Sequence, residues 1–136
     1  MYLQQMRFGT RITYELICDV NRDAVLVPPF IFQPLAENAI IHGLSPKESG
    51  GRILVHIRKE MENLFITVRD TGVGMEEEEL SALLNSLTGE EMQTRGIGLK
   101  NVYERIKKLY RDSEFEISSN VGEGTTIQIR LDLSET

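Results

Sequence analysis

Residues 51–74 read GRILVHIRKEMENLFITVRDTGVG, and the predicted architecture is built around them. Apolar and polar side chains alternate on both sides of residues 61–63, which predicts two strands joined as an antiparallel hairpin. The second strand ends at Asp70, the first residue of the glycine-containing turn 70–74. Because the strands alternate in this way, we expect a sheet with one buried face and one polar face. The apolar positions of the hairpin are Ile53, Val55, Ile57, Leu64, Ile66 and Val68.

Working outward from this hairpin, alternation predicts three further strands, and a 3.6-residue period predicts three helices. The strands are expected around residues 10–19, 115–117 and 127–133. The helices are expected over residues 30–42, 76–86 and 98–110. The first helix should be closed by Gly43, and Gly122-Glu123-Gly124 should form the turn of a C-terminal hairpin. Together the elements predict a two-layer α/β sandwich: a mixed, mostly antiparallel sheet covered on one face by three helices.

Two segments are expected to lie outside regular structure. Residues 1–9 are too few for a complete element, so we expect them to be the end of a linker that leads into a domain of residues 10–136. Residues 85–97 lack periodicity and contain several polar residues and glycines, which favours a loop. The helices on either side should bury the stripes Leu80, Leu83, Leu84, Leu87 and Leu99, Val102, Ile106, Leu109.

The composition argues against nucleic-acid binding, an internal disulfide, a zinc site and a membrane-spanning segment. The 21 acidic and 15 basic residues give a net charge of −6, which disfavours nonspecific binding to nucleic acid. A single cysteine, Cys18, excludes an internal disulfide, and its place on the apolar face of a strand predicts a core residue. Two histidines are few for a dedicated zinc site. No apolar stretch is long enough to span a membrane.

Asn38 lies in the middle of the first predicted helix, where asparagine has poor helix propensity. It either bonds the backbone as a structural residue or offers its amide oxygen to Mg²⁺, which prefers hard oxygen ligands. His42, one turn later, could contact phosphate or bond a free carbonyl at the helix end. Glu37 points about 100° away from Asn38 and is a candidate proton acceptor or a polar boundary residue.

Asp70 precedes two glycines, Gly72 and Gly74, that allow a flat ligand to approach the backbone closely. The segment is compatible with an ordinary turn. A carboxylate in this place could also accept a hydrogen bond from the amino group of adenine. Guanine presents a carbonyl at the same position, and an unmatched buried pair costs about 1–3 kcal/mol, so we expect ATP to be preferred to GTP.

Gly96-Ile97-Gly98-Leu99 precedes the most periodic helix, whose N-terminus and dipole suit a polyphosphate. Arg95 and Lys100 flank the motif and could add positive charge. The lysine-bearing loop GxxxxGK[ST] of other nucleotide-binding proteins is absent. Thr125 belongs first to the predicted hairpin turn, and could also reach the base.

Taken together, these motifs resemble the ATP-binding catalytic domain of sensor histidine kinases, in the gyrase–Hsp90–histidine kinase–MutL ATPase superfamily, and most closely the LytS/YesM type. The resemblance spans nearly the whole chain. It is carried by Arg7-Phe8-Gly9, Val27-Pro28-Pro29, Gln33 to Gly43, Asp70 to Met75, Gly96 to Val102 and Gly122-Glu123-Gly124-Thr125. It implies the Bergerat-type ATP-binding fold, with ATP and Mg²⁺ as cofactors.

The resemblance also implies residue roles. Asn38 would hold Mg²⁺, Asp70 would read adenine, and residues 85–97 would form a lid over the phosphates. The implied catalytic residues are Asn38, Glu37 and His42. The implied nucleotide-binding residues are Asn38, His42, Asp70, Gly72, Gly74, Arg95, Gly96, Ile97, Gly98, Leu99, Lys100 and Thr125.

Two departures from the superfamily pattern affect the expected reaction. Members that hydrolyse ATP carry a glutamate where this chain has Pro34, so we expect poor hydrolysis and phosphoryl transfer to a histidine instead. Many histidine kinases carry a lysine where this chain has Ile41, so phosphate contacts are expected to shift to His42, Arg95 or Lys100.

The resemblance further implies partners outside the chain. His42 and His56 are the two histidines, and neither has the context of a dimerisation helix. The acceptor histidine is therefore expected on a dimerisation domain of the same protein, with a response-regulator receiver domain downstream. The full protein is expected to be membrane-embedded with this domain on the cytoplasmic side, without direct membrane contact or nucleic-acid binding.

Two alternatives remain open at the level of sequence. An anti-sigma-factor serine kinase of the same superfamily shares the motif Asn-Ala-Ile-Ile-His-Gly, but carries glutamate at the position of Pro34. A regulatory module could bind nucleotide without transferring phosphate.

Overall fold

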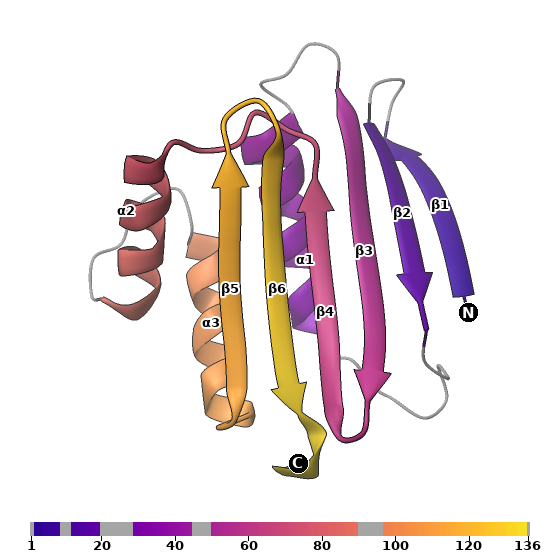
Figure 1. Ribbon diagram of the computed structural model, residues 1–136, viewed down its shortest axis with the longest axis vertical. Helices are drawn as coiled ribbons and strands as arrows, with labels where there is room; N and C mark the ends of the chain where they lie inside the picture. The colour runs from indigo at the N-terminus through magenta and orange to yellow at the C-terminus, as the bar shows by residue number, and fades with distance from the viewer. Residues whose placement is uncertain (1, 9–11, 20–28, 45–49, 90–96, 136) are drawn as a thin grey trace.

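The computed structural model describes residues 2–8, 12–19, 29–44, 50–89 and 97–135 of the chain. It contains a six-stranded sheet in the order β1-β2-β3-β4-β6-β5, with α1 and α3 on one face (Figure 1). The strands are β1 (Tyr2–Phe8), β2 (Ile12–Cys18), β3 (Gly51–Glu60), β4 (Asn63–Asp70), β5 (Ser113–Asn120) and β6 (Gly124–Asp132). The helices are α1 (Pro29–Asn38), the π-helix η1 (Ala39–Leu44), α2 (Glu77–Thr88), α3 (Ile97–Leu109) and the short 3-10 helix η2 (Leu133–Glu135).

The mixed, mostly antiparallel sheet is confirmed, because β2 and β3 are parallel and the other neighbouring strands are antiparallel. The expectation that residues 1–9 form no complete element is wrong. Residues 2–8 form β1, which pairs with β2 from Tyr2↔Cys18 to Phe8↔Ile12. The sequence does not predict this strand, because residues 2–8 lack a clear alternation of apolar and polar side chains. The strand forms through backbone hydrogen bonds to β2.

The core lies between the sheet and the helices, in rows of aliphatic side chains that cross the strands. One row runs from Val55 through Val68 and Ile127 to Ile117. Leu99, Val102 and Ile106 of α3 are at most 1% exposed, as their period predicts. Cys18 is also buried, which confirms its predicted place in the core.

The helices differ from the prediction in three places. The first helix does not end at Gly43: it changes to a π-helix at Ala39 and continues to Leu44. Ala39 and Leu44 are five residues apart and both buried, which the wider π turn allows. Leu84 and Leu109 were expected in buried stripes but are 37% and 52% exposed. Each lies on the margin of its helix stripe, where the period alone does not settle burial.

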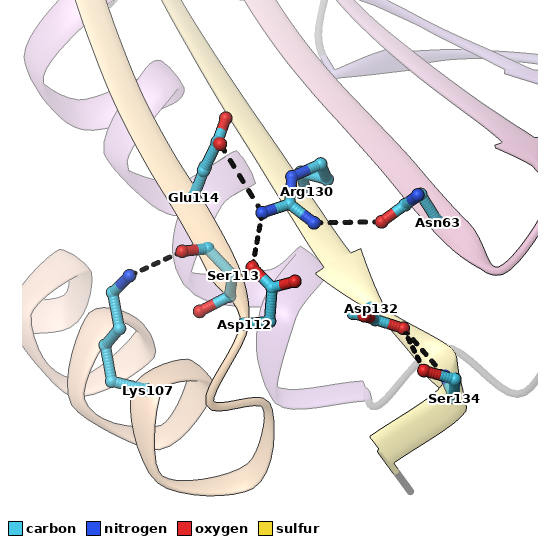
Figure 2. Close-up of polar contacts among 8 residues, drawn as sticks. All are labelled: Asn63, Lys107, Asp112, Ser113, Glu114, Arg130, Asp132 and Ser134. Carbon is cyan, nitrogen blue, oxygen red and sulfur yellow. Dashed lines mark hydrogen bonds and ion pairs between the residues drawn. The ribbon is translucent and has the colours of Figure 1, made fainter.

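The other face of the sheet is polar and carries a cluster around Arg130 (Figure 2). Its guanidinium donates hydrogen bonds to Asn63 on β4 and to Asp112 before β5, at 2.9 and 2.7 Å. Farther along the chain, hydrogen bonds from Ser134 lower the pKa of Asp132 below its ordinary value. On the same face His56 Nε2 lies 2.6 Å from Asp19 Oδ2, so the imidazole and the carboxylate are hydrogen-bonded. Each helix in the described segments is too short or too polar to span a lipid bilayer.

Candidate functional site

A row of polar residues closes the core at one end of the sheet. Asp70 ends β4 and faces Ile53 on one side and Thr125 on the other, and Thr125 faces Ser119 on β5. Residues directly opposite in antiparallel strands project from the same face. Asp70 and Thr125 are therefore on the helix-covered face, where they are 5% and 7% exposed. The next row beyond the aliphatic side chains of the core therefore contains the buried carboxylate of Asp70 and the hydroxyls of Thr125 and Ser119.

The carboxylate of Asp70 is held by backbone N–H groups. Its Oδ1 accepts a hydrogen bond from Gly72 N at 2.9 Å, the geometry of an Asx turn, and one from Thr125 N at 3.3 Å. The second contact joins residues 55 positions apart in the sequence. A buried carboxylate requires such donors, because burial without them is costly. Asp70 is therefore both an anchor for the turn and a fixed acceptor at the edge of the core.

Two glycines allow the backbone segments around Asp70 to come together. Gly74 has φ +71°, and a Cβ on it would lie 2.0 Å from the carbonyl oxygen of Asn120. Gly124 has φ +113°, and a Cβ on it would lie 2.0 Å from the carbonyl oxygen of Asp70. Both positions exclude any side chain on steric grounds. Gly74 therefore has a steric role toward the backbone of Asn120, while its expected role toward a ligand stays a prediction. Gly124 was expected simply as a turn residue.

Ser119 connects the three segments that meet at this row. Its Oγ accepts a hydrogen bond from Met75 N at 2.8 Å, donates to the carbonyl of Gly124 at 3.1 Å, and lies 2.8 Å from Thr125 Oγ1. Thr125 itself lies within β6 and not in the hairpin turn as predicted; the turn occupies residues 121–123. The strand pairing brings Thr125 beside Asp70, so it is part of the site.

The first helix places Asn38, Glu37 and His42 over the same end of the sheet. Asn38 is the last residue of α1 and is half-buried, where the α-helix gives way to η1. His42 is half-buried within η1, which packs against β3, β4 and β6. Glu37 is exposed and accepts a hydrogen bond from Gln33 Nε2 at 3.1 Å. Through the packing of η1, the segment from Asn38 to His42 lies next to β4, the strand that ends at Asp70.

The start of α3 lies beside α1. A Cβ on Gly98 would lie 3.7 Å from Pro34 Cβ, an ordinary contact, so Gly98 is not required by packing in this conformation. Leu99 is 1% exposed, which leaves its backbone rather than its side chain for ligand contacts. Lys100 Nζ donates to the carbonyl of Gly89 at 2.6 Å, at the end of α2. Arg95 and Gly96 lie outside the described residues, as does most of the predicted lid, and the side chain of Ile97 is not described.

Gly51 and Ser119 support the site and were not predicted from the sequence. A Cβ on Gly51 would lie 2.4 Å from Thr71 Oγ1, which in turn accepts a hydrogen bond from Arg52 N. Ser119 was missed because serine is common in strands and turns. The alternation of β5 did carry a signal for Ser119, since it places this residue on the same face as buried Ile117. Within the described part of the chain, no three His, Cys, Asp or Glu side chains are grouped as a metal site.

Comparison with known proteins agrees with this architecture. Residues 30–135 match the family model described as histidine kinase-, DNA gyrase B-, and HSP90-like ATPase. The chain is 32% identical over 126 residues to the sensor protein LytS of Bacillus anthracis. It is 35% identical over 132 residues to the sensor histidine kinase YesM of Bacillus subtilis (strain 168).

These alignments cover 92% and 96% of this chain but 21% of each relative, and the chain spans less than half the length of the curated relatives it matches. Among solved structures, the histidine kinase domain of the blue-light activated histidine kinase from Erythrobacter litoralis EL346 is similar, with a TM-score of 0.69 and 20% identity. That similarity covers 93% of this chain and 54% of the other, and it confirms the fold.

Proposed function

Because this chain belongs to the family of histidine kinase-, DNA gyrase B- and HSP90-like ATPases, we propose that it is the ATP-binding catalytic domain of a sensor histidine kinase. In this proposal it transfers the γ-phosphoryl group of ATP to a histidine on a dimerisation domain of the same protein. The observation that carries the proposal is the buried carboxylate of Asp70, held by two backbone N–H groups between glycines that admit no side chain. This arrangement suits the edge of a flat base with a hydrogen-bond donor.

The proposed catalytic chemistry is positioning and charge stabilisation, as is usual for phosphoryl transfer. Asn38 offers one amide oxygen to Mg²⁺, which commonly binds few protein oxygens together with phosphate oxygens and water. The half-buried end of α1 fits this role, because the side chain is neither sealed in the core nor fully solvated. The bound cation would neutralise charge on the phosphates. His42 would contact the phosphates, and Glu37 would act as a proton acceptor.

Pro34 favours transfer over hydrolysis and disfavours the serine-kinase alternative. It lies in α1 next to Gly98 at the start of α3, where the phosphates are proposed to bind. Its ring can neither accept a proton nor orient a water molecule by hydrogen bonding. A residue in this place that cannot activate water leaves the acceptor side chain as the nucleophile.

The partners of the full protein follow from the same proposal. Its relatives LytS and YesM are named as a sensor protein and a sensor histidine kinase, and each is several times longer than this chain. We therefore place the acceptor histidine on a dimerisation domain, with a response-regulator receiver domain as the downstream partner. The sensor of the full protein would be membrane-embedded, with this domain on the cytoplasmic face.

Substitution of Asp70 tests the proposal. In Asp70→Asn, the side-chain oxygen can still accept the bonds from Gly72 and Thr125, so the fold should persist. The negative charge that favours the base amino group is lost. Since a hydrogen bond to a charged group contributes about 1.5–3 kcal/mol, calorimetry with Mg-ATP should show affinity about 10- to 100-fold weaker.

The matched control is Asp132→Asn, at the opposite end of the β4–β6 pairing. It should bind Mg-ATP like the unsubstituted chain. The transfer step is measured with γ-labelled ATP and an added dimerisation domain that carries the acceptor histidine. Label on that histidine, lost in Asp70→Asn and kept in Asp132→Asn, is the expected result; equal ATP affinity in the two variants would refute the role of Asp70.

A further inference from the structure

We propose that Ser119 is a positioning residue that sets base selectivity by making the Thr125 hydroxyl a hydrogen-bond acceptor. The inference rests on the proposed function, because it requires a purine base beside Asp70 and Thr125. Ser119 lies on the edge strand β5, opposite Thr125 and on the same face of the sheet. Thr125 lies between Ser119 and Asp70 in the strand pairing, so the proposed influence of Ser119 on a base is indirect.

The hydrogen bonds of Ser119 determine the direction of the contact with Thr125. A serine hydroxyl has one hydrogen to donate and two lone pairs to accept with. The N–H of Met75, 2.8 Å away, takes one lone pair. The carbonyl oxygen of Gly124, 3.1 Å away, has no hydrogen, so the Ser119 hydrogen must make that bond. One lone pair remains for Thr125 Oγ1 at 2.8 Å, and therefore Thr125 is the donor.

Thr125 is left with lone pairs alone for any further hydrogen bond. Its hydrogen is used by Ser119, so its Oγ1 can accept but not donate. The neighbouring carboxylate of Asp70 also accepts hydrogen bonds when ionised, and the two residues are joined by the bond from Thr125 N to Asp70 Oδ1. Two adjacent acceptors match the amino group at position 6 of adenine, directly or through water. They oppose the carbonyl oxygen that hypoxanthine or guanine presents there.

Removal of the Ser119 hydroxyl should therefore relax the selectivity instead of simply weakening the site. In Ser119→Ala, Thr125 loses its acceptor on β5, and its hydroxyl is free to rotate and donate to a 6-oxo group. A residue that merely supports the fold would weaken all nucleotides alike. The ratio of affinities for two bases separates these outcomes.

The experiment is calorimetric titration of the 136-residue chain with ATP and with inosine 5′-triphosphate, each with Mg²⁺. Inosine triphosphate differs from ATP in the base, where a 6-oxo group replaces the 6-amino group and N1 carries a hydrogen. We expect Ser119→Ala to lower the ratio of ATP affinity to inosine triphosphate affinity about tenfold, the equivalent of one hydrogen bond. Ser119→Thr, which retains a hydroxyl, should keep the ratio.

Ser118→Ala is the matched control, because it removes a neighbouring hydroxyl from the exposed face of the same strand. Its ratio should equal that of the unsubstituted chain. An unchanged ratio in a folded Ser119→Ala variant would overturn the inference. If that variant does not fold, Thr125→Val is used: it removes the acceptor itself, so its ratio must also fall, and an unchanged ratio again overturns the inference.

Failure of the proposed function gives a different result. An unsubstituted, folded chain that binds neither nucleotide overturns the proposed function and this inference together. An unsubstituted chain that binds ATP, with a Ser119→Ala ratio equal to its own, overturns only the role of Ser119.

Discussion

At the scale of single residues, the turn between β5 and β6 separates two effects that a glycine can have. Gly122 and Gly124 both have positive φ, +81° and +113°. A Cβ on Gly122 would meet nothing within 4 Å, whereas one on Gly124 would collide with the backbone of Asp70. Gly122 is therefore required at most for backbone conformation, and Gly124 for conformation and for the close approach that forms the site.

This difference predicts unequal losses of stability. Gly122→Ala should lower the free energy of unfolding by about 1–2 kcal/mol, the cost of a left-handed conformation for an L-residue. Gly124→Ala should lose about 1–3 kcal/mol more, because the backbone of β4 must move. Urea unfolding of the two variants measures both values, and each serves as the control for the other. Equal losses would mean that the contact with Asp70 is not sterically tight.

At the scale of elements, α2 and α3 are linked across residues 90–96 by Lys100. Its ammonium group donates to the carbonyl of Gly89, the C-cap residue of α2. A cation near a helix C-terminus is favourable because it complements the helix dipole and satisfies a free carbonyl. The sequence had suggested a phosphate contact for Lys100. In this structure the side chain connects α3 to the end of α2, whose residues 85–88 fall within the range expected for the lid. The phosphate contact of Lys100 stays a prediction.

The helix link makes a prediction for stability. Lys100→Met should lower the free energy of unfolding by about 0.3–1 kcal/mol, the usual size of a charge at a helix terminus. The loss should diminish at high salt, because salt screens the interaction. Lys59→Met, which removes an exposed lysine of β3, is the comparison variant and should have little effect. A salt-independent loss in Lys100→Met would point to side-chain packing instead of charge.

At the scale of the whole molecule, β1 extends the sheet by one strand beyond β2. The linker expected over residues 1–9 would contribute nothing to the stability of the domain. The structure instead pairs seven residues of β1 with β2, which turns β2 from an edge strand into an inner strand. An unpaired edge strand is also a site for association between chains.

Truncation distinguishes the strand from a linker. A chain that starts at residue 10 should have a free energy of unfolding lower by more than about 2 kcal/mol, since each lost backbone hydrogen bond contributes about 0.5–1.5 kcal/mol. Its tendency to associate, measured by light scattering, should increase. A truncated chain of unchanged stability would restore the interpretation of residues 1–9 as a linker.

Local sequence patterns were sufficient to predict the main elements and the buried faces of the strands. These features follow from local periodicity, because alternation and the 3.6-residue repeat report which side chains face the core. Asp70 and Gly74 were also recognisable locally, since their spacing forms a single turn. The helices depart from these patterns at Leu84 and Leu109, which lie at the margins of their stripes, and at the π-helix that continues the first helix past Gly43.

Three features depend on long-range pairing of the strands: β1, the close approach of Gly124 to Asp70, and the contacts of Ser119. The hydrogen bond from Met75 to Ser119 spans 44 positions of sequence, and the one from Thr125 to Asp70 spans 55. Contacts of this kind arise when the sheet closes and distant strands come into register, and no local pattern specifies their partners. The motifs thus identify the residues that a ligand would meet, while strand pairing provides the residues that hold them in place.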